Sequence, residues 1–265
     1  MLRRAPLVLP VAVLALVLLV LAGCAGPLGS ENGSDRKATP KVGACRDLTA
    51  SDLNQQTNAS PVVDCGEPHT AVTFASGTLP FAAGQAYADV RHDRFVFTTC
   101  QQAFADYIGA DESLALRVRL SWSWFRPSER GWSNGARWYR CDLVGGPTGA
   151  NRLVDLPGDA HDLLAEGDPD AWLACADGAT VAHGAKVPCT AAHTWRAVTT
   201  IKLGQPEDSY PGDDVVQART RSYCQESVRS WLHYPSDYEY GYTWFKEDRW
   251  AEGNRRSICW ARTDR

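Results

Sequence analysis

The sequence predicts an α+β fold made of two tandem small domains, each an antiparallel sheet with one packed helix and two disulfides. Three observations support this prediction. Eight of the nine cysteines fall into two sets of four, and the residues around them recur at matching offsets. Each set includes a segment whose apolar residues have helical spacing. Each also includes a segment of alternating apolar and polar residues, which is typical of a strand with one buried face.

The first 23 residues resemble a lipoprotein signal peptide. Arg3 and Arg4 form a short basic start, and residues 5–21 are apolar. Residues 21–24 read Leu-Ala-Gly-Cys, which resembles the lipobox cut by the lipoprotein signal peptidase, where Cys24 receives a diacylglycerol. The alternative is an uncleaved anchor helix, for which about 17 apolar residues are short. We therefore expect a lipidated Cys24 that anchors the protein to the outer face of the cytoplasmic membrane.

Segments 24–41 and 146–169 have the composition of linkers. The first is dominated by Gly, Ser, Pro and charged residues, so we expect a flexible tether between the membrane and the folded part. The second is rich in Gly, Pro and acidic residues, and its Asp162-Leu-Leu-Ala stretch fits a helical turn. The two predicted domains are then 42–145 and 170–265.

The eight remaining cysteines are expected to form disulfides, because they are even in number and lie in an exported, oxidising compartment. Eight cysteines allow 105 pairings, and pairing within each domain leaves about nine. The third cysteine of each set lies on the apolar face of the predicted helix and the fourth in the last strand, so their bridge would join helix to sheet. The favoured pairs are Cys45–Cys65, Cys100–Cys141, Cys175–Cys189 and Cys224–Cys259.

Each predicted helix carries the third cysteine of its domain. Apolar residues at offsets 0, 4, 7 and 8 from that cysteine share one helix face. The second helix is expected to begin at Asp213, since acidic residues are favoured near a helix N-terminus. The residues on these faces are Cys100, Phe104, Tyr107 and Ile108 in the first domain and Cys224, Val228, Trp231 and Leu232 in the second.

Strands are predicted on both sides of each helix. One strand follows His69, and its counterpart follows His193. A later strand is predicted from alternation over residues 114–124 and 238–244, and a turn containing glycine then leads to a final strand with the fourth cysteine. The tripeptide Ala-Val-Thr after His69 aligns with the same tripeptide after His193 only with a two-residue gap, which predicts a shortened segment in the first domain.

The Cys-x3-His element, the cysteine-bearing helix and a closing Trp-x2-Gly-x-Arg-x3-Cys motif resemble the septum formation domain of actinobacterial membrane proteins and lipoproteins. The resemblance covers both domains and implies a role near cell division, without an established biochemical activity. The first domain departs from the family pattern in its shortened segment after His69 and its wider first cysteine pair. The closing motif is Trp132, Gly135, Arg137 and Cys141 in one domain and Trp250, Gly253, Arg255 and Cys259 in the other.

His69 and His193 are candidate ligand-binding residues because both domains contain them. One interpretation is a metal ligand or a hydrogen-bond donor to a bound molecule. The spacing from the preceding cysteine would suit zinc only if the cysteines were reduced, and no Cys-x2-Cys pair is present. The favoured interpretation is a buried histidine bonded to backbone at the start of a strand, with no metal and no cofactor.

Trp132 and Trp250 are the second pair of candidates, since aromatic faces stack against sugar rings in many glycan-binding proteins. In a domain of this size, however, a recurring tryptophan more often belongs to the core. Arg137 and Arg255 follow at the same offset, so a cation–π contact at the turn is expected in both domains.

Motif and charge analysis favours binding over catalysis. The sequence contains no Gly-x-Ser-x-Gly elbow, no His-Glu-x-x-His zinc helix and no phosphate-binding loop. Without residues 1–23 the chain has 25 basic and 31 acidic residues, a net charge near −6, which argues against nucleic acid as a partner. We expect a lipid-anchored binding or scaffold module for an envelope protein or glycan. The alternatives are a hydrolase acting on envelope polymers and a sensor of a small ligand.

The loops that differ between the domains are the predicted recognition elements, because the shared residues are those that the fold needs. They are residues 46–64 against 176–188, and residues 75–97 against 201–215.

Overall fold

The computed structural model describes residues 33–146 and 151–264 of the chain. The predicted signal peptide, Cys24 and the first part of the tether lie outside the described residues. In the part that is described, no helix is long and apolar enough to cross a membrane. Both sheets belong to one unit, Gly33–Arg265.

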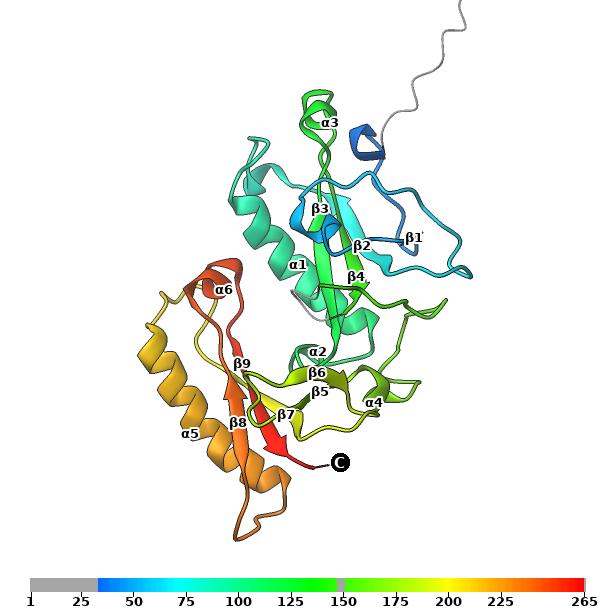
Figure 1. The fold of residues 1–265 in the computed structure, drawn as a ribbon. Helices are drawn as coiled ribbons and strands as arrows, with labels where there is room; N and C mark the ends of the chain where they lie inside the picture. Colours follow the sequence, from blue (N-terminus) through cyan, green and yellow to red (C-terminus); the bar gives the residue numbers. More distant parts are fainter. Residues whose placement is uncertain (1–32, 147–150, 265) are drawn as a thin grey trace, which may run out of the picture. The chain divides into compact units, whose positions relative to one another are not determined.

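The first sheet consists of β1 (Cys45–Arg46), β2 (Ala71–Thr78), β3 (Leu120–Phe125) and β4 (Trp138–Gly145). The strands are antiparallel in the order β1-β2-β4-β3, so β3 is an edge strand. Helix α1 (Arg91–Tyr107) packs on β2 and β4 through buried residues spaced four apart, Val96, Cys100 and Phe104 (Figure 1). All eight residues of β4 are buried, because both of its faces are covered.

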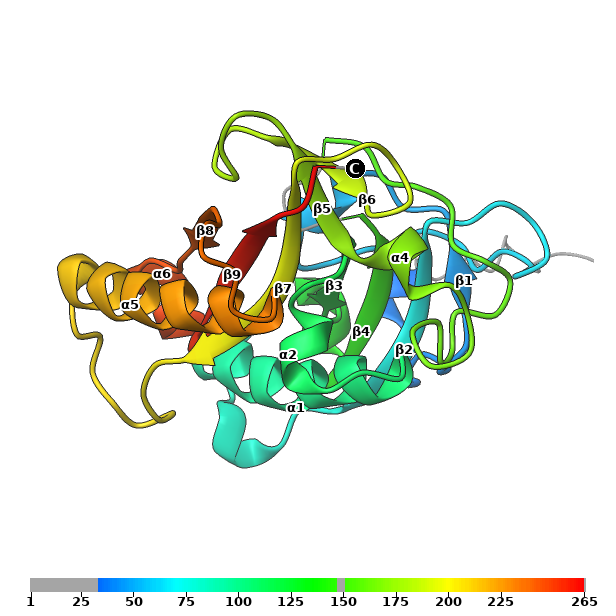
Figure 2. The ribbon, with the colours of Figure 1, turned by 90° about the horizontal axis from the view of Figure 1, so that it is seen from below.

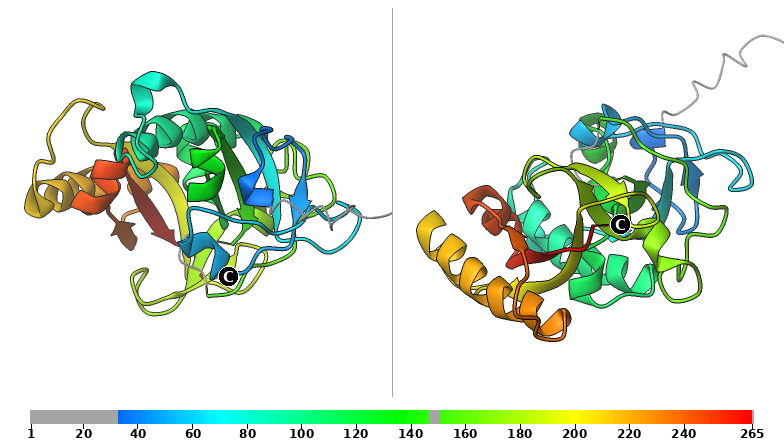
Figure 3. Two further views of the ribbon diagram at one scale, coloured as in Figure 1. Left: turned by 90° about the horizontal axis from the view of Figure 1, so that it is seen from above. Right: turned by 60° about the horizontal axis from the view of Figure 1, so that its bottom comes forward.

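The second sheet repeats this plan with one more strand. It contains β5 (Ala174–Asp177), β6 (Ala185–Pro188), β7 (Trp195–Lys202), β8 (Tyr240–Thr243) and β9 (Arg256–Arg262). The order is β6-β5-β7-β9-β8, again antiparallel. Helix α5 (Asp213–Trp231), which begins at the predicted Asp213, lies along β7, β9 and β8 (Figures 2 and 3). The α+β class and the two tandem units are confirmed.

The four disulfides of the structure are the four pairs that the sequence favours. In each domain one bridge closes the start of the sheet, and the other joins the helix to the final strand. They are Cys45–Cys65, Cys100–Cys141, Cys175–Cys189 and Cys224–Cys259.

The alternating segment 114–124 is a strand only from Leu120 onward, so the predicted strand was too long. Residues 112–115 form the short helix α2 (Glu112–Ala115), because the Asp111 carboxylate accepts a hydrogen bond from the backbone N–H of Leu114 at 2.6 Å. The glycine turns likewise contain short helices. These are α3 (Glu129–Ser133) and α6 (Glu247–Glu252), which precede Gly135 and Gly253; the remaining short helices are α4 (Pro169–Trp172), η1 (Gly33–Asp35), η2 (Asp52–Asn54) and η3 (Phe81–Ala83).

The predicted gap after His69 is wrong. Thr73 pairs with the residue that follows Cys141, and Ala197 pairs with the residue that follows Cys259, so these two positions correspond. Each lies four residues after its histidine, and no residue is missing. The register of both strands shifts at the same place, just before the pairing with the fourth cysteine. This shared bulge, rather than the identical tripeptides, sets the alignment of the copies.

The connection between the domains packs against the first one instead of spanning solvent. Leu156, Ala160 and Leu164 are buried in the core that α1 forms with the first sheet. The backbone N–H of Leu156 donates to the carbonyl of His69 at 2.8 Å. The predicted linker therefore contributes to the core of the first domain.

Candidate functional site

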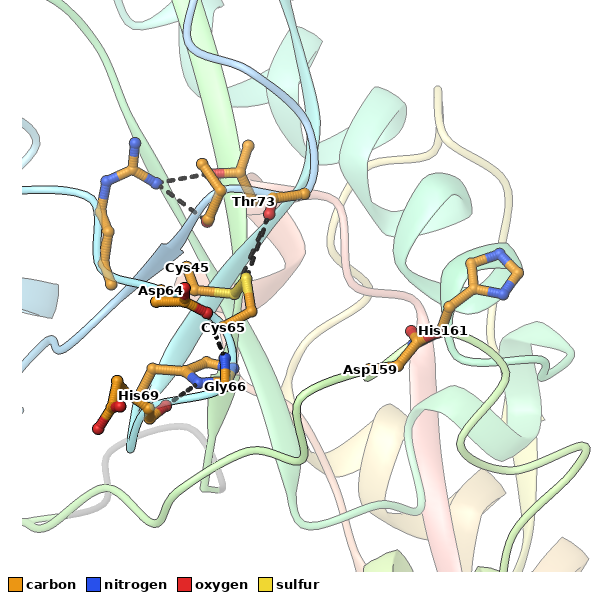
Figure 4. The surroundings of a disulfide bond; sticks show 12 residues. Cys45, Asp64, Cys65, Gly66, His69, Thr73, Asp159 and His161 are labelled. Atoms are coloured by element: carbon orange, nitrogen blue, oxygen red, sulfur yellow. Dashed lines mark hydrogen bonds between the residues drawn. A yellow bond between two sulfur atoms is a disulfide. The ribbon is translucent and has the colours of Figure 1, made fainter.

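His69 and His193 occupy equivalent, buried positions before β2 and β7. In each, ring Nδ1 is hydrogen-bonded to the carbonyl oxygen two residues earlier, of Glu67 at 2.8 Å and of Ala191 at 2.7 Å. Their exposed fractions are 1% and 2%. Figure 4 shows the first of these bonds together with the Cys45–Cys65 disulfide. This geometry is the one expected of a buried histidine that bonds to backbone at the start of a strand.

The described residues contain no group of three or more His, Cys, Asp or Glu side chains arranged to hold a metal ion. The cysteine four residues before each histidine forms a disulfide, so it offers no thiolate to a metal. Nε2 of both histidines is buried and has no hydrogen-bond partner within the described ranges.

Trp132 and Trp250 are core residues, each 6% exposed. The Arg137 guanidinium lies 4.0 Å from the ring centroid of Trp132, and Nη1 donates to the Trp132 carbonyl at 2.7 Å. Arg255 repeats both contacts with Trp250, at 3.7 Å and 2.6 Å. The predicted cation–π contacts are thus present in both domains. Because both rings are buried, they offer no free face to a ligand.

A cleft of about 1270 Å³ lies elsewhere, between the two sheets of the Gly33–Arg265 unit. One wall is built by α1 and the edge strand β3. The other wall is the face of the second sheet that points away from α5, together with the end of β8. Side chains from both domains line it, among them Trp122, Trp124, Arg119, Lys186, Trp244 and Ile258.

The face of the second sheet opposite α5 is covered only in part, which explains why the cleft exists. In β9, Cys259 and Ala261 face α5, whereas Ile258 and Trp260 point to the opposite side. In the first domain the corresponding face is closed by residues of the loop 46–64, including the buried Leu48. The loop 176–188 of the second domain is shorter and leaves Ile258 on the cleft wall.

Three tryptophans of the cleft, Trp122, Trp124 and Trp244, are half-buried, whereas the fourth, Trp260, is buried like Trp132 and Trp250. Alternation along β3 places Trp122 and Trp124 on one side of the edge strand. Nε1 of Trp122 donates to Gln101 of α1 at 3.3 Å, which fixes its ring. Trp244, just after β8, has the Lys246 ammonium 4.0 Å from its ring centroid.

The cleft is basic although the chain is acidic overall. Six basic residues and two acidic residues line it, whereas the full chain has a net charge of −4. Three of the basic residues are paired with carboxylates, and three have no carboxylate partner within the described part of the chain. The pairs are Arg91–Asp89, Arg249–Glu252 and Arg256–Glu112; the unpaired residues are Arg94, Arg119 and Lys186.

Arg119 is half-buried and Lys186 is exposed, and neither has a carboxylate counter-ion in the described part of the chain. Burial lowers the pKa of both groups, and no nearby carboxylate opposes that shift. The Lys186 ammonium donates to the carbonyl of Val181 at 2.8 Å and lies 4.5 Å from the ring centroid of Trp260. A bound anion would supply the counter-ion that both cations lack within the described residues.

Three of the four predicted recognition segments contribute to the cleft. Residues come from 46–64, 75–97 and 176–188, whereas no residue of 201–215 lines it. The sequence analysis places Trp124 and Trp244 at the ends of predicted strands but identifies neither of them, nor Arg119, as a site residue. The alternation in the strands signalled a shared face, but not that this face is covered only in part.

A family model described as "Septum formation" matches the chain twice, at residues 27–125 and 116–259. The two matches correspond to the two tandem copies and together cover most of the chain. A search of curated proteins and a search of solved structures found no match.

Proposed function

The chain belongs to the septum formation family, and from this we propose that it is a lipid-anchored binding protein of the cell envelope that acts near the division septum. The lipid anchor is supported by the basic start, the apolar run and the Leu-Ala-Gly-Cys sequence that ends at Cys24. Changing Cys24 to Ala should leave unprocessed precursor or release the protein from the membrane. A variant that is cleaved normally and stays membrane-bound would contradict the anchor.

The cleft is the binding site in this proposal. The observation that carries it is that half-buried tryptophans and cations without a carboxylate partner in the described residues line the same cleft, and that both domains contribute them. Binding sites commonly combine aromatic walls with a few fixed polar groups. The two copies thus build one composite site instead of two equal sites.

Binding fits the cleft better than hydrolysis does. Glycoside hydrolases use two carboxyl groups on opposite sides of the bond that breaks. The two acids of this cleft are Asp93, which accepts a hydrogen bond from Gln56 at 3.2 Å, and Glu252, which is paired with Arg249 at 2.9 Å. A hydrolase or a small-ligand sensor remains the alternative that the following experiment addresses.

Proximity labelling from the intact lipoprotein in its native cell tests the proposal. The variant Trp124→Ala/Trp244→Ala removes one aromatic side chain from each wall. The control Trp231→Ala removes a 43% exposed tryptophan of α5, a helix that does not line the cleft. We expect the cleft variant, but not the control, to lose specific labelled neighbours at the septum. Identical labelling by all three proteins would place the function outside the cleft.

A further inference from the structure

Arg119 and Lys186 are held in place where the two sheets meet. Val118, the neighbour of Arg119, forms a β-bridge with Leu173, and the backbone N–H of Arg119 donates to the carbonyl of Trp172 at 2.7 Å. Lys186 pairs with Ala176, four residues after Trp172 on the same chain segment. Backbone pairing therefore anchors both cations to one chain segment, residues 172–176, and both residues line the same cleft.

Both cations retain unused donors. Arg119 has no side-chain hydrogen bond to any residue in the described ranges, and its Nε is buried. A guanidinium carries five N–H donors and an ammonium carries three, of which Lys186 uses one on Val181. Charge-assisted bonds to a carboxylate or phosphate are the strong bonds available to such groups.

The tryptophans require a second property of the ligand. Trp122 and Trp124 in one wall and Trp244 in the other present broad, partly exposed rings. Sugar rings have faces of polarised C–H groups that pack against the negative face of an aromatic ring. A linear polyphosphate would satisfy the cations and leave the tryptophans unused, whereas a neutral glycan would do the reverse.

Resting on the proposed binding function, we infer that the ligand of the cleft is an acidic glycan. Its sugar rings stack on Trp122, Trp124 and Trp244, and its carboxylate or phosphate groups bind Arg119 and Lys186. Single-stranded nucleic acid combines rings and anions too, but its binding proteins follow the phosphate backbone along a positively charged groove. Carboxylates already pair with three of the six basic residues of this cleft, which favours a ligand with fewer contacts to cations.

Isothermal titration of the purified full-length lipoprotein in detergent tests the inference with defined probes. The acidic probes are oligogalacturonate, with a carboxylate on each sugar, and a phosphomannan oligosaccharide. The comparison probes are a neutral malto-oligosaccharide, linear polyphosphate, oligo-dT and poly-L-glutamate. We expect binding of at least one acidic glycan, weakened by added salt, and much weaker binding of all comparison probes.

Charge variants assign the binding to the cleft. Arg119→Gln and Lys186→Gln should each weaken binding of the acidic glycan by about tenfold, as expected for the loss of a charge-assisted hydrogen bond. The matched control Arg130→Gln removes one positive charge at an 82% exposed side chain outside the cleft and should leave affinity within about twofold.

The outcomes separate this inference from the proposed function. Absence of binding by both acidic glycans overturns the inference, and so does equal or tighter binding of any comparison probe. Equal weakening by Arg130→Gln also overturns it, because binding would then follow net charge. The proximity-labelling comparison judges the binding function by itself, since it does not depend on the ligand class.

Discussion

Replacing Asp142 by Asn should strongly destabilise the protein, because this carboxylate neutralises a buried cluster of arginines. Asp142 is fully buried and accepts hydrogen bonds from Thr73 Oγ1 at 2.7 Å and from Arg140 Nε at 3.0 Å. Arg46 Nη1 lies 4.0 Å from the same carboxylate. Both arginine side chains are 5% exposed. Asparagine keeps the size of the side chain but leaves two guanidinium groups without a negative partner.

The expected cost is about 3–5 kcal/mol, the range for breaking a buried ion pair by removing one partner. For a chain of this size that corresponds to a fall in Tm of roughly 6–20 °C. Burial also lowers the pKa of Arg46, with the neighbouring positive charge of Arg140 as a second cause that Asp142 opposes. Loss of that opposing charge increases the penalty.

Thermal and urea denaturation of the oxidised protein, followed by tryptophan fluorescence, measures this effect. Thr73→Val removes the hydrogen bond that Thr73 Oγ1 accepts from Arg46 Nη1 and the one that it donates to Asp142, both 2.7 Å long, but keeps every charge, so it should cost about 2–4 kcal/mol. Glu239→Gln breaks an exposed pair with Arg262, whose side chains are 60% and 37% exposed, and should cost less than about 1 kcal/mol. If Asp142→Asn is no less stable than Glu239→Gln, the reasoning about the buried cluster is refuted.

Three further perturbations probe other parts of the fold. Trp250→Ala should lower the free energy of unfolding by about 3–5 kcal/mol as a core truncation, with Trp231→Ala as the exposed control; near-native stability measured by urea denaturation would contradict a core role. Replacing Cys224 and Cys259 by Ser opens a loop of 35 residues and should cost about 3–4 kcal/mol, whereas unchanged unfolding of the oxidised protein would argue that the bridge adds no stability. Arg256 donates to Glu112 and lowers the pKa of that carboxyl, so its stabilising effect is present at neutral pH and is lost as pH falls through the folded-state pKa. Glu112 is 41% exposed, so this effect should stay below about 1 kcal/mol. Tm measured as a function of pH should therefore fall slightly less at acidic pH in Glu112→Gln than in the wild-type protein. The same dependence of Tm on pH in both proteins would disprove the linkage.

The repeated framework was predictable because it depends on local spacing. In each domain the third cysteine lies on the apolar face of the helix and the fourth lies in the final strand. A bridge between them joins the helix to the sheet, which favours the pairs Cys100–Cys141 and Cys224–Cys259. The strand that was predicted from Leu114 failed at its start, because capping by Asp111 favours a helical turn over the alternating pattern.

The cleft was not predictable in the same way, because it depends on what covers each sheet face. Trp124 and Trp132 have the same side chain and lie eight residues apart, yet Trp124 is half-buried and lines the cleft, whereas Trp132 is buried in the core. Alternation assigns a residue to a face but does not report whether a distant loop closes that face. The closure of the first sheet by residues 46–64 is such a long-range fact.

Leu156, Ala160 and Leu164 pack in the core of the first domain, so the first folded domain is longer than the first sequence repeat, which ends at Gly145. A first copy cut after Gly145 would lose part of its own core, whereas one that extends to residue 168 would keep these side chains. Proteases should therefore spare residues 153–164 in the native protein. Recombination that separates the two copies would therefore have to cut the gene after the codon for Leu164. A cut just after the strand that bears Cys141 would remove part of the core of the first copy.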